Sequence, residues 1–559
     1  MKSKTPKQFK IENKEIRIDN NHLDRRFNSQ PICYKNSDLN VKLIDKYGRE
    51  YIDNRKVIEK VKKLLKAGRI IAIKGLEGFY LACDGTNHKS IANLRQRKNI
   101  KSKPLSLMMK DIDEVKKYCY LNEKEKSILN RSNKPIVILK KKNNNLPNNI
   151  SFNNDSLGVM LPYTTFHSML FDEELKTLVI TSGNISGMPM AYENEDALEK
   201  LKDIADFFLI HSKEIYIPME ESVVKVLLNE ERMIRIGRGY YPINLKYKDE
   251  NMDTVESIEN SLKHNHINKV HVYHNHAHIV SCMFENNISE KVIGLCFDGI
   301  GYGENKNLWG SEFLICDNKN VKKVGHLKYM KMPGGDNATK EPWKMAVSLL
   351  ESWSRNKLNL PVEELISNLS INNLFSYIKY KNYNTILYMI KNNVNTPLTS
   401  SMERLFDGIS AFLNFQNKIS YEGEACIELE NLAKKSMNTK DYYKFEINYE
   451  NSQFIVDTDY IIEEVFKDVI NNINPCEIAM KFHNTVVEFS FRICLYLRKL
   501  YHLNIVALSG GVFENEIIFT KLYEKLNNNN FQVLTHKILP CNDSNLSVGQ
   551  LIIGMNKEL

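Results

Sequence analysis

Residues 271–278 read His271-Val272-Tyr273-His274-Asn275-His276-Ala277-His278, and the remainder of the chain is best ordered around them. His274 and His278 are four residues apart, so on a helix their side chains lie one turn apart on the same face. Two imidazoles in that arrangement suit a single metal ion. The competing interpretation is that they are surface or helix-packing residues, which is the commoner outcome for such a pair viewed alone. Further ligand candidates elsewhere in the chain favour the metal-site interpretation over the packing interpretation.

Two carboxylates are candidates to complete the ligand set. Asp298 follows the apolar stretch 292–297 and precedes a glycine-rich turn that ends at Gly303. Asp543 lies in a polar, turn-like patch near the C-terminus. Two histidines and two carboxylates suit a first-row divalent metal. We therefore predict a metal site of His274, His278, Asp298 and Asp543 that holds one iron or zinc ion.

Length and composition indicate a multidomain globular protein. The 559 residues exceed what one hydrophobic core usually serves, so two or three domains are expected. With 42% hydrophobic and 26% charged residues, the chain has the composition of a folded domain. It contains no apolar run of about 18 residues, and its N-terminus lacks a signal-peptide core. These features predict a cytoplasmic protein that does not bind a membrane.

Charge and cysteine usage argue against a nucleic-acid partner and against a disulfide or zinc-ribbon framework. The net charge of +9 comes from 77 basic against 68 acidic residues, and the lysines are scattered along an Asn- and Ile-rich sequence. Scattered lysines indicate a general bias in amino-acid composition, whereas a nucleic-acid-binding surface would cluster them. The ten cysteines never fall as Cys-x-x-Cys, so neither a disulfide framework nor a zinc ribbon is indicated.

The first half of the chain has an α/β pattern with phosphate-binding features. The stretch 57–65 predicts an amphipathic helix, and 69–74 predicts a short strand that delivers Lys74 to a glycine-containing turn. A basic run at 95–103 would be an ordinary solvated face if it stood alone. Hydroxyl and amide side chains after the apolar strand at 179–181 suit oxyanion binding. The predicted nucleotide triphosphate site contains Lys74, Arg95, Arg97, Lys98, Lys103, Thr164, Ser182, Asn184, Ser186 and Arg238.

The second half contains two glycine turns that each follow an apolar strand, at 298–303 and at 509–511. Each turn alone is most often an ordinary β-turn. Two widely separated phosphate loops of this kind suit a two-lobed, actin-like fold that clamps a nucleotide. Long helices are expected at 403–413 and 475–501.

Specific motifs connect both halves to known families. The first half resembles a YrdC-type domain in Lys74-Gly-x-x-Gly-Phe79, Leu94-Arg-x-Arg-Lys98, Leu161-Pro-Tyr-Thr164, Thr181-Ser-Gly-Asn-x-Ser-Gly187 and Arg238-Gly-Tyr-x-Pro242. The second half resembles the carbamoyl-transfer domain of the HypF family in His274-x-His-Ala-His278, Phe297-Asp-Gly-x-Gly-Tyr-Gly303, Met332-Pro-Gly-Gly-Asp336, Tyr421-Glu-Gly423 and Ser509-Gly-Gly-Val-Phe-Glu-Asn515. The resemblance covers roughly residues 24–555 in the family's domain order.

The resemblance implies a fold and a domain division. It implies an α/β and α+β multidomain protein, with a YrdC-like α/β domain followed by a two-lobed actin-like (ASKHA) carbamoyltransferase domain. We place a polar N-terminal segment with a degenerate zinc-finger remnant at 1–55. The YrdC-like nucleotide and acyl-adenylate domain is expected at 56–245, and the metal-dependent transfer domain at 246–559.

The resemblance also implies a reaction. ATP, with Mg²⁺, and carbamate or carbamoyl phosphate would form carbamoyl-adenylate in the first domain, where Lys74 and Arg97 are the expected catalytic groups. His274 and His278 would serve the transfer of the carbamoyl group to the C-terminal cysteine of HypE, in the maturation of [NiFe] hydrogenases. Asn275 and His276 would support the metal ligands. The nucleotide cradle implied for the second domain comprises Gly335, Asp336, Glu422, Ser509, Gly510, Gly511 and Asn515.

Three departures from the family pattern stand in the sequence. No acylphosphatase-type Gly-x-Val-Gln-Gly segment occurs, so a separate acylphosphatase is one expected source of carbamate. The zinc modules are reduced to Cys33, with Asn36 where its partner would be, so no structural zinc is expected there. Residues 218–221, Pro-Met-Glu-Glu, stand where the family shows an arginine followed by two aspartates, which alters the adenylation site.

Three alternative functions remain open at this point. One is O-carbamoylation of a small molecule, although such transferases have the reverse domain order. Another is tRNA threonylcarbamoyl-adenosine synthesis, which uses the same domain types, normally as separate proteins. The last is a non-catalytic scaffold that binds HypE, against which the retained metal and nucleotide motifs argue.

Overall fold

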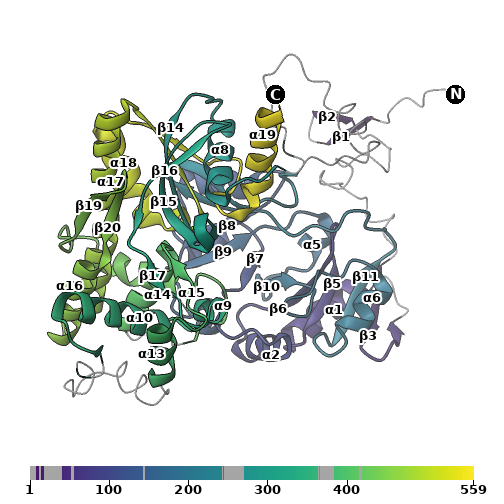
Figure 1. Ribbon diagram of the computed structural model, residues 1–559. Coiled ribbons are helices and arrows are strands. Elements are labelled where there is room, and N and C mark those ends of the chain that lie inside the picture. Colours follow the sequence, from purple (N-terminus) through teal and green to yellow (C-terminus); the bar gives the residue numbers. More distant parts are fainter. Residues whose placement is uncertain are drawn as a thin grey trace, which may run out of the picture. The chain divides into compact units, whose positions relative to one another are not determined.

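The chain divides into two compact units, residues 1–243 and 244–559, in the computed structural model (Figure 1). The structure describes residues 8–11, 14–17, 41–51, 56–142, 145–241, 243, 270–362, 364, 383–413 and 418–558. The predicted zinc-finger remnant, with Cys33 and Asn36, lies outside the described residues.

The first unit is built on an eleven-stranded mixed sheet. In chain order its strands are β3 (Val41–Asp45), β4 (Glu50–Tyr51), β5 (Ile71–Lys74), β6 (Phe79–Asp84), β7 (Ser106–Met109), β8 (Ile136–Lys140), β9 (Ser156–Met160), β10 (Thr177–Ser182), β11 (Phe207–His211), β12 (Val223–Leu227) and β13 (Glu230–Arg235). Their spatial order is β13-β12-β8-β9-β7-β10-β6-β5-β11-β3-β4. The strands β1 (Gln8–Ile11) and β2 (Lys14–Arg17) form a separate hairpin.

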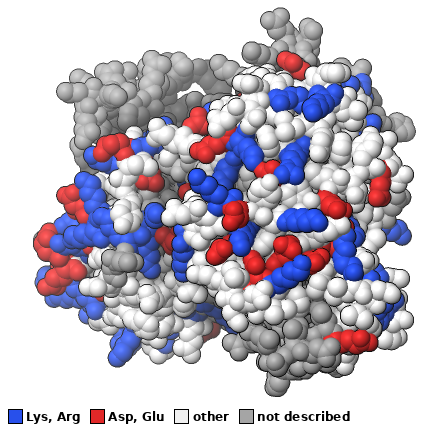
Figure 2. Space-filling model, turned by 90° about the vertical axis from the view of Figure 1, so that its left-hand side faces the viewer, with Lys and Arg blue, Asp and Glu red and all other residues white. Residues whose placement is uncertain are grey.

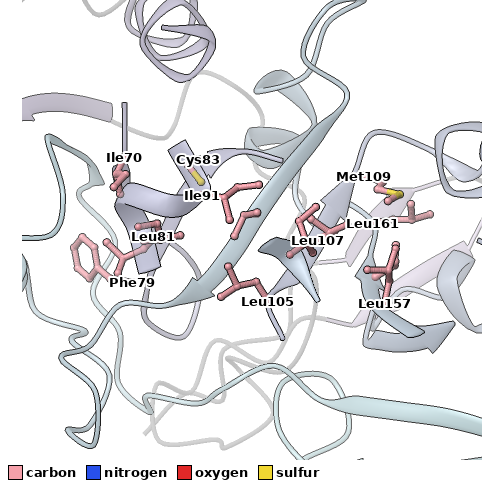
Figure 3. Close-up of a cluster of buried hydrophobic side chains, with 14 of the residues drawn as sticks. Ile70, Phe79, Leu81, Cys83, Ile91, Leu105, Leu107, Met109, Leu157 and Leu161 are labelled. Carbon is pink, nitrogen blue, oxygen red and sulfur yellow. The ribbon is translucent and has the colours of Figure 1, made fainter. Parts of the chain in front are cut away.

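Both faces of the central strands are buried, which explains why they read as continuous apolar runs. Successive side chains of a strand point to opposite faces, and alternate residues accordingly enter two different hydrophobic cores. Phe79, Leu81 and Cys83 of β6 enter one core, whereas Tyr80 and Ala82 enter the other. Figure 3 shows the first core, in which side chains of β6, β7 and β9 gather.

Helices cover this sheet: α1 (Val57–Lys66), α2 (His88–Lys98), α3 (Ile112–Tyr118), α4 (Glu123–Asn130), α5 (Thr165–Met169), α6 (Asn194–Lys200) and the 3₁₀ turn η2 (Asn148–Ile150). The amphipathic helix predicted at 57–65 is α1, which buries Val57, Val61 and Leu65. The first part of the basic run, with Arg95, Arg97 and Lys98, forms the last turn of α2, and Lys101 and Lys103 follow the helix. Asn87 caps the start of α2 by accepting main-chain N–H groups, so the helix register that presents these basic residues is well defined.

The assignment of residues 41–51 to a separate N-terminal segment was wrong. β3 pairs antiparallel with β11, and β4 pairs with β3, so both strands belong to the first sheet. β3 also buries Leu43 completely. A five-residue strand with two charged residues shows little apolar periodicity, so only its pairing reveals it.

The second unit contains a nine-stranded mixed sheet. Its strands are β14 (Val292–Tyr302), β15 (Leu308–Cys316), β16 (Val321–Leu327), β17 (Met330–Lys331), β18 (Leu398–Thr399), β19 (Glu446–Glu450), β20 (Gln453–Asp457), β21 (Ile505–Ser509) and β22 (Gln532–Thr535). The main order is β19-β20-β16-β15-β14-β21-β22, with β17 and β18 beside β15. β14 pairs antiparallel with β15 and parallel with β21, which places Cys296 opposite Ser509.

The helices of this unit are α8 (His274–Glu285), α9 (Asp336–Lys340), α10 (Trp343–Trp353), α13 (Tyr383–Asn392), α14 (Met402–Phe412), α15 (Glu424–Ala433), α16 (Thr458–Ile470), α17 (Pro475–Tyr501), α18 (Glu516–Asn528) and α19 (Leu546–Glu558). Shorter turns are η3 (Glu304–Lys306), η4 (Ser354–Leu358), η5 (Lys434–Ser436), η6 (Gly511–Glu514) and η7 (Asp543–Asn545). The predicted helices at 403–413 and 475–501 are α14 and α17.

One hydrophobic core joins α8 and α19 to β14, β15, β21 and β22. Ala277, Val280 and Met283 supply the face of α8 that enters this core. Gly549 lets α19 approach α8 closely, because a Cβ there would lie 1.9 Å from the carbonyl oxygen of Ala277. The helix that bears the two predicted histidine ligands is therefore held from two sides.

The surface of the second unit around α16, α17 and α18 mixes both signs of charge. Figure 2 shows basic and acidic side chains interspersed on the face that bears these helices. Lys525 and Arg492 both pair with Glu488, and Lys467 pairs with Glu463. Among the described helices, none has the length and apolar character needed to cross a membrane.

Candidate metal centre and nucleotide site

The four predicted metal ligands converge. One ligand atom from each of His274, His278, Asp298 and Asp543 lies within 4.8 Å of the others. The Nε2 atoms of the two histidines are 3.2 Å apart. Asp298 Oδ2 lies 2.8 Å from Nε2 of His274 and 3.3 Å from that of His278. Asp543 Oδ1 lies 3.4 Å and 3.3 Å from the same two atoms.

Three different elements deliver these side chains. The first two turns of α8 carry the two histidines, one turn apart as their spacing predicted. Asp298 lies inside β14, at a register shift between Phe297 and Gly301, where the strand carries extra residues relative to β15. An irregularity of this kind re-aims a side chain out of the regular pleat. Asp543 opens the 3₁₀ turn η7 just before α19.

The carboxylates and the imidazoles shift one another's pKa values. Burial acts to lower the pKa of His274, but hydrogen bonds with Asp298 and Asp543 outweigh it and raise the pKa to about 9. The pKa of His278 is raised in the same way. Burial opposes ionisation of Asp298, yet its contacts with both histidines hold its pKa well below the usual range. The cluster thus concentrates negative charge against two buried rings, which is an environment that a cation stabilises.

The donor set and its spacing fit a divalent metal. Ligand atoms about 2.1 Å from a first-row metal lie roughly 3.0–3.4 Å from their neighbours in octahedral or tetrahedral geometry. Four of the five contacts among these atoms, at 3.2–3.4 Å, fall in that range, and the contact between His274 Nε2 and Asp298 Oδ2 is shorter, at 2.8 Å. Asp543 is the exposed member, with 68% of its side chain accessible, whereas His278 is wholly buried. An exposed ligand on one side leaves room for a substrate group to approach.

Two predicted supporting residues flank the ligands on other faces of α8. Asn275 Nδ2 donates to Glu312 Oε2 at 3.1 Å. His276 Nε2 lies 2.8 Å from the carbonyl oxygen of Asp317. Burial raises the pKa of Glu312 to about 8. Both contacts tie α8 to β15 or the residue after it, and neither residue provides a ligand atom to the cluster.

The glycine turn at 509–511 lies against the metal ligands. Gly511 N donates to Asp298 Oδ1 at 3.1 Å and so orients that carboxylate. Gly510 has φ 105°, and a Cβ there would lie 2.2 Å from the carbonyl oxygen of Phe297. Ser509 Oγ lies 3.4 Å from Nδ1 of His278. We predicted that residues 509–511 contact a nucleotide. In the structure they contact the metal ligands Asp298 and His278.

The other predicted cradle residues occupy varied environments. Asn515 caps α18 by accepting from two main-chain N–H groups, and its Nδ2 lies 3.0 Å from Nε2 of His483. Asp336 opens α9, and both Asp336 and Glu422 are exposed. Gly335 precedes Asp336 with φ 53°. A nucleotide contact by these residues stays a prediction.

Glu403 is a buried carboxylate near the metal ligands that sequence reasoning treated only as a helix start. A Cβ on Gly299 would lie 2.8 Å from its Oε2, so the carboxylate sits directly beside the residue that follows Asp298. Burial raises its pKa to about 8, with Arg404 opposing and Asp298 adding to the effect. The pattern Thr-Ser-Ser-Met-Glu offers no periodicity that marks this side chain as buried.

In the first unit, the structure gathers part of the predicted triphosphate site. Lys98 Nζ donates to the carbonyl oxygen of Ser182 and lies 3.2 Å from Thr181 Oγ1. Ser182 Oγ in turn lies 2.9 Å from Asn184 Oδ1. Burial, and to a lesser degree the nearby Lys103, lowers the pKa of Lys98 to about 8. The end of α2 and the end of β10 therefore place an ammonium group among hydroxyl oxygens, as an anion site requires.

The predicted arginines are engaged within the fold. Arg95 donates to the carbonyl oxygens of Asn149, Ile150, Lys101 and Lys103. Arg97 donates to the carbonyl oxygen of Ile204 and to Asp206. Arg238 donates to Glu221 and to the carbonyl oxygens of Asn133 and Lys134. A nucleotide contact by any of these guanidinium groups would have to replace bonds that hold loops together.

The remaining predicted residues differ in exposure. Lys74 is buried at the end of β5, with its Nζ 3.4 Å from the carbonyl oxygen of His211, and burial lowers its pKa. Thr164 caps α5 through the N–H of His167. Ser186 is exposed in the turn after β10. In the altered stretch 218–221, Glu221 is buried against Tyr80 and Arg238, whereas Glu220 pairs with Arg235 on the surface.

Family models match both units. The model described as "Carbamoyltransferase, Kae1-like Domain, second subdomain" matches residues 294–550. The Sua5–YciO–YrdC model, described as "Telomere recombination", matches residues 63–237. Together with the mixed sheets, these matches define the class: a carbamoyltransferase with a YrdC-like α/β domain followed by a Kae1-like transfer domain.

Whole-chain relatives give the family itself. Carbamoyltransferase HypF of Synechocystis is 30% identical over 87% of this chain and 71% of its own length. A probable carbamoyltransferase HypF of Methanocaldococcus jannaschii is 29% identical over 90% of this chain and 73% of its own. The crystal structure of a full-length HypF in its phosphate- and nucleotide-bound form superposes with a TM-score of 0.84 at 33% identity, covering 96% of this chain and 76% of that one. The chain belongs to the HypF carbamoyltransferase family and is an enzyme of carbamoyl transfer in hydrogenase maturation.

The comparisons also bear on the alternatives. A putative threonylcarbamoyl-AMP synthase of Methanocaldococcus jannaschii is 26% identical, but over only 37% of this chain. The aligned part has about the length of one unit of this chain, whereas the alignments with the HypF relatives extend over both units. The small-molecule and tRNA alternatives are therefore not favoured. The relatives are named carbamoyltransferases, which supports an enzyme over a non-catalytic scaffold.

Proposed function

We propose that the first unit forms carbamoyl-adenylate from ATP, Mg²⁺ and carbamate or carbamoyl phosphate, and that the second unit transfers the carbamoyl group to the C-terminal cysteine of a HypE partner. The observation that carries this proposal is the convergence of His274, His278, Asp298 and Asp543 on one point in a chain of the HypF family. These four residues would hold one divalent ion, iron or zinc. The bound ion would act as a Lewis acid on the carbamoyl oxygen.

In the adenylation step, the first unit's task is to hold a triphosphate and neutralise its developing charge. Lys98 and the hydroxyls of Thr181 and Ser182 offer that environment at the ends of α2 and β10. The carbamate oxygen would attack the α-phosphorus, and pyrophosphate would leave with the bonding electron pair. The nucleotide in the related HypF crystal structure supports a nucleotide role for the family's fold.

In the transfer step, the second unit positions two reactants. Gly511 holds the Asp298 carboxylate, and the partner's thiolate would reach the site from the side where Asp543 is exposed. A carbon–sulfur bond forms, the carbon–oxygen bond to the phosphate breaks, and AMP leaves as the anion. The partner's thiol proton is released to solvent before the attack.

The decisive experiment is a reconstituted transfer. The full chain is incubated with ATP, Mg²⁺, carbamoyl phosphate and HypE, with and without an added acylphosphatase, and the partner's terminal cysteine is examined by mass spectrometry. We expect a mass increase of one carbamoyl group on that cysteine, dependent on ATP. Adenylate formation with no modified HypE, while a small alcohol or a tRNA is modified instead, would overturn the assignment of the acceptor.

The pH dependence of adenylation follows from Lys98. Because its pKa is lowered to about 8, Lys98 carries its charge below that pH and loses it above. We expect the KM for ATP in ATP–pyrophosphate exchange to rise about 10-fold between pH 7 and 9, because a hydrogen bond from a charged donor contributes about 1.5–3 kcal/mol. Lys98→Met should have, at every pH, a KM for ATP similar to that of the unaltered enzyme at pH 9.

The control for this prediction is Lys101→Met, which removes an exposed lysine just beyond α2. Its pH profile should match that of the unaltered enzyme. A profile that persists unchanged in Lys98→Met would show that another group is responsible for the pH dependence.

A further inference from the structure

A hydrogen-bonded chain of three residues leads away from the metal ligand His278. Ser509, at the end of β21, is wholly buried. Its hydroxyl lies 3.4 Å from Nδ1 of His278 on one side and 2.9 Å from Nε2 of His536 on the other. Nδ1 is the nitrogen of His278 that faces away from the other ligands, because its Nε2 meets Asp298 and Asp543.

His536 is anchored in turn by a buried carboxylate. Its Nδ1 lies 3.1 Å from Glu285 Oε2. Glu285 also accepts the main-chain N–H groups of Lys537 and Ile538, at 2.7 Å and 2.6 Å. Burial acts to raise the pKa of Glu285, but the bonds from His536 and the main chain outweigh it and lower the pKa. The carboxylate therefore serves as an ionised acceptor at the end of the chain.

The donors and acceptors along this chain point in one direction. A carboxylate can only accept, so Nδ1 of His536 carries the hydrogen, and in the neutral ring Nε2 is then an acceptor. Asn545 supports that assignment, because its Nδ2, a donor only, lies 3.4 Å from the same Nε2 and 2.9 Å from the carbonyl oxygen of Pro540. Ser509 therefore donates to His536 and accepts from Nδ1–H of His278.

We propose that Glu285, His536 and Ser509 are positioning residues that set the Nδ1–H tautomer of His278 and aim its Nε2 lone pair at the metal. This inference rests on the metal site of the proposed function. A hydrogen bond to the outer nitrogen of a ligating histidine fixes its orientation and raises its basicity. Glu285 ends the helix that His278 helps to begin, so one helix carries both ends of the relay.

The test measures metal affinity rather than turnover. Co²⁺ is titrated into the metal-free full chain in competition with a chromophoric chelator, and the visible spectrum of the bound ion is recorded. Because loss of such an outer contact typically weakens binding about 10- to 100-fold, we expect that loss in Ser509→Ala and in His536→Leu. Their Co²⁺ spectra should also shift, since His278 is free to rotate.

Conservative and matched variants separate positioning from packing. His536→Gln retains an oxygen that can accept from Ser509, so its Co²⁺ affinity should lie closer to that of the unaltered chain than the affinity of His536→Leu. Ser281→Ala is the control for Ser509→Ala, because it removes a buried hydroxyl on α8 that donates to the carbonyl oxygen of His278 instead of the ring. It should bind Co²⁺ as the unaltered chain does.

The outcomes distinguish the two levels of inference. If the unaltered chain binds Co²⁺ but Ser509→Ala binds it equally tightly with the same spectrum, the relay is overturned and the metal site stands. The relay is also overturned if Ser281→Ala loses as much affinity as Ser509→Ala, since packing would then explain both. Failure of the unaltered chain to bind Co²⁺, Zn²⁺ or Fe²⁺ overturns the metal site of the proposed function and the relay with it.

Discussion

Replacing His278 with alanine is expected to abolish carbamoyl transfer while leaving adenylate formation intact. His278 is wholly buried, and its Nε2 is within 3.3 Å of both carboxylates of the cluster. Loss of this ligand removes the site for an ion that would supply several kcal/mol of transition-state stabilisation, so transfer should fall by roughly 1000-fold or more. Mass spectrometry of HypE measures the transfer, and ATP–pyrophosphate exchange measures adenylation.

Two companion variants make this result interpretable. His276→Ala removes a buried imidazole from the same helix, but one that bonds the carbonyl oxygen of Asp317 and provides no ligand atom, so it should lose far less transfer than His278→Ala. Asp543→Asn alters the exposed ligand without disturbing the core, and it should lose transfer as His278→Ala does. Simultaneous loss of exchange and transfer in both ligand variants would argue against two separable sites.

Replacing Arg238 with alanine is expected to destabilise the first unit by about 3–5 kcal/mol, the usual cost of leaving one partner of a buried ion pair alone. Its guanidinium lies between Glu221, at 2.6 Å, and Glu77, at 3.9 Å, and stacks 3.7 Å from the ring centre of Tyr163. Both carboxylate oxygens of Glu77 are buried without a hydrogen bond from the described residues. Removal of Arg238 would leave the buried Glu221 carboxylate without its ion-pair partner and with only the hydroxyl of Tyr80 as a side-chain donor. Burial already raises the pKa of Glu77 well above its usual value, and loss of Arg238 would raise that pKa further.

The distribution of aromatic residues provides a clean measurement. All three tryptophans, Trp309, Trp343 and Trp353, lie in the second unit, so their fluorescence follows that unit alone during urea unfolding. The circular dichroism of Arg238→Ala should show an early transition that tryptophan fluorescence does not. Arg235→Ala is the control, because it breaks an exposed pair with Glu220, which contributes no more than about 1 kcal/mol, and one hydrogen bond to the carbonyl oxygen of Glu221. It leaves the buried pair of Arg238 and Glu221 in place. Equal effects of the two variants would contradict the buried-pair argument.

Several elements were predictable because their signal is local. The four-residue spacing of His274 and His278 implies a shared helix face whatever surrounds it, and α8 has that form. Apolar runs bounded by turn residues marked β5, β14 and β21, although β14 continues through Asp298 instead of ending before it. A glycine-rich turn after an apolar strand marked Asp298 as a ligand candidate, and a polar, turn-like patch marked Asp543.

The roles of the polar side chains were harder to read. A basic run followed by hydroxyl residues has the composition of a phosphate site whether or not its guanidinium groups are free. Arg95 finds two of its carbonyl partners 54 and 55 residues away, and Arg238 finds its partners 17 or more residues away, so only the fold supplies them. His536, which follows an ordinary apolar strand, carries no local mark of its contact with Ser509.

The sequence by itself determined the class of the protein, the order of its two domains and the identity of four metal-ligand candidates, because spacing and motif depend on neighbouring residues. Only the tertiary structure decided which polar groups are still available to a ligand. That property depends on hydrogen-bond partners brought together from distant segments, such as Ser509 between His278 and His536. Burial obliges each such group to find a partner inside the fold, and the chain order does not reveal which partner it finds.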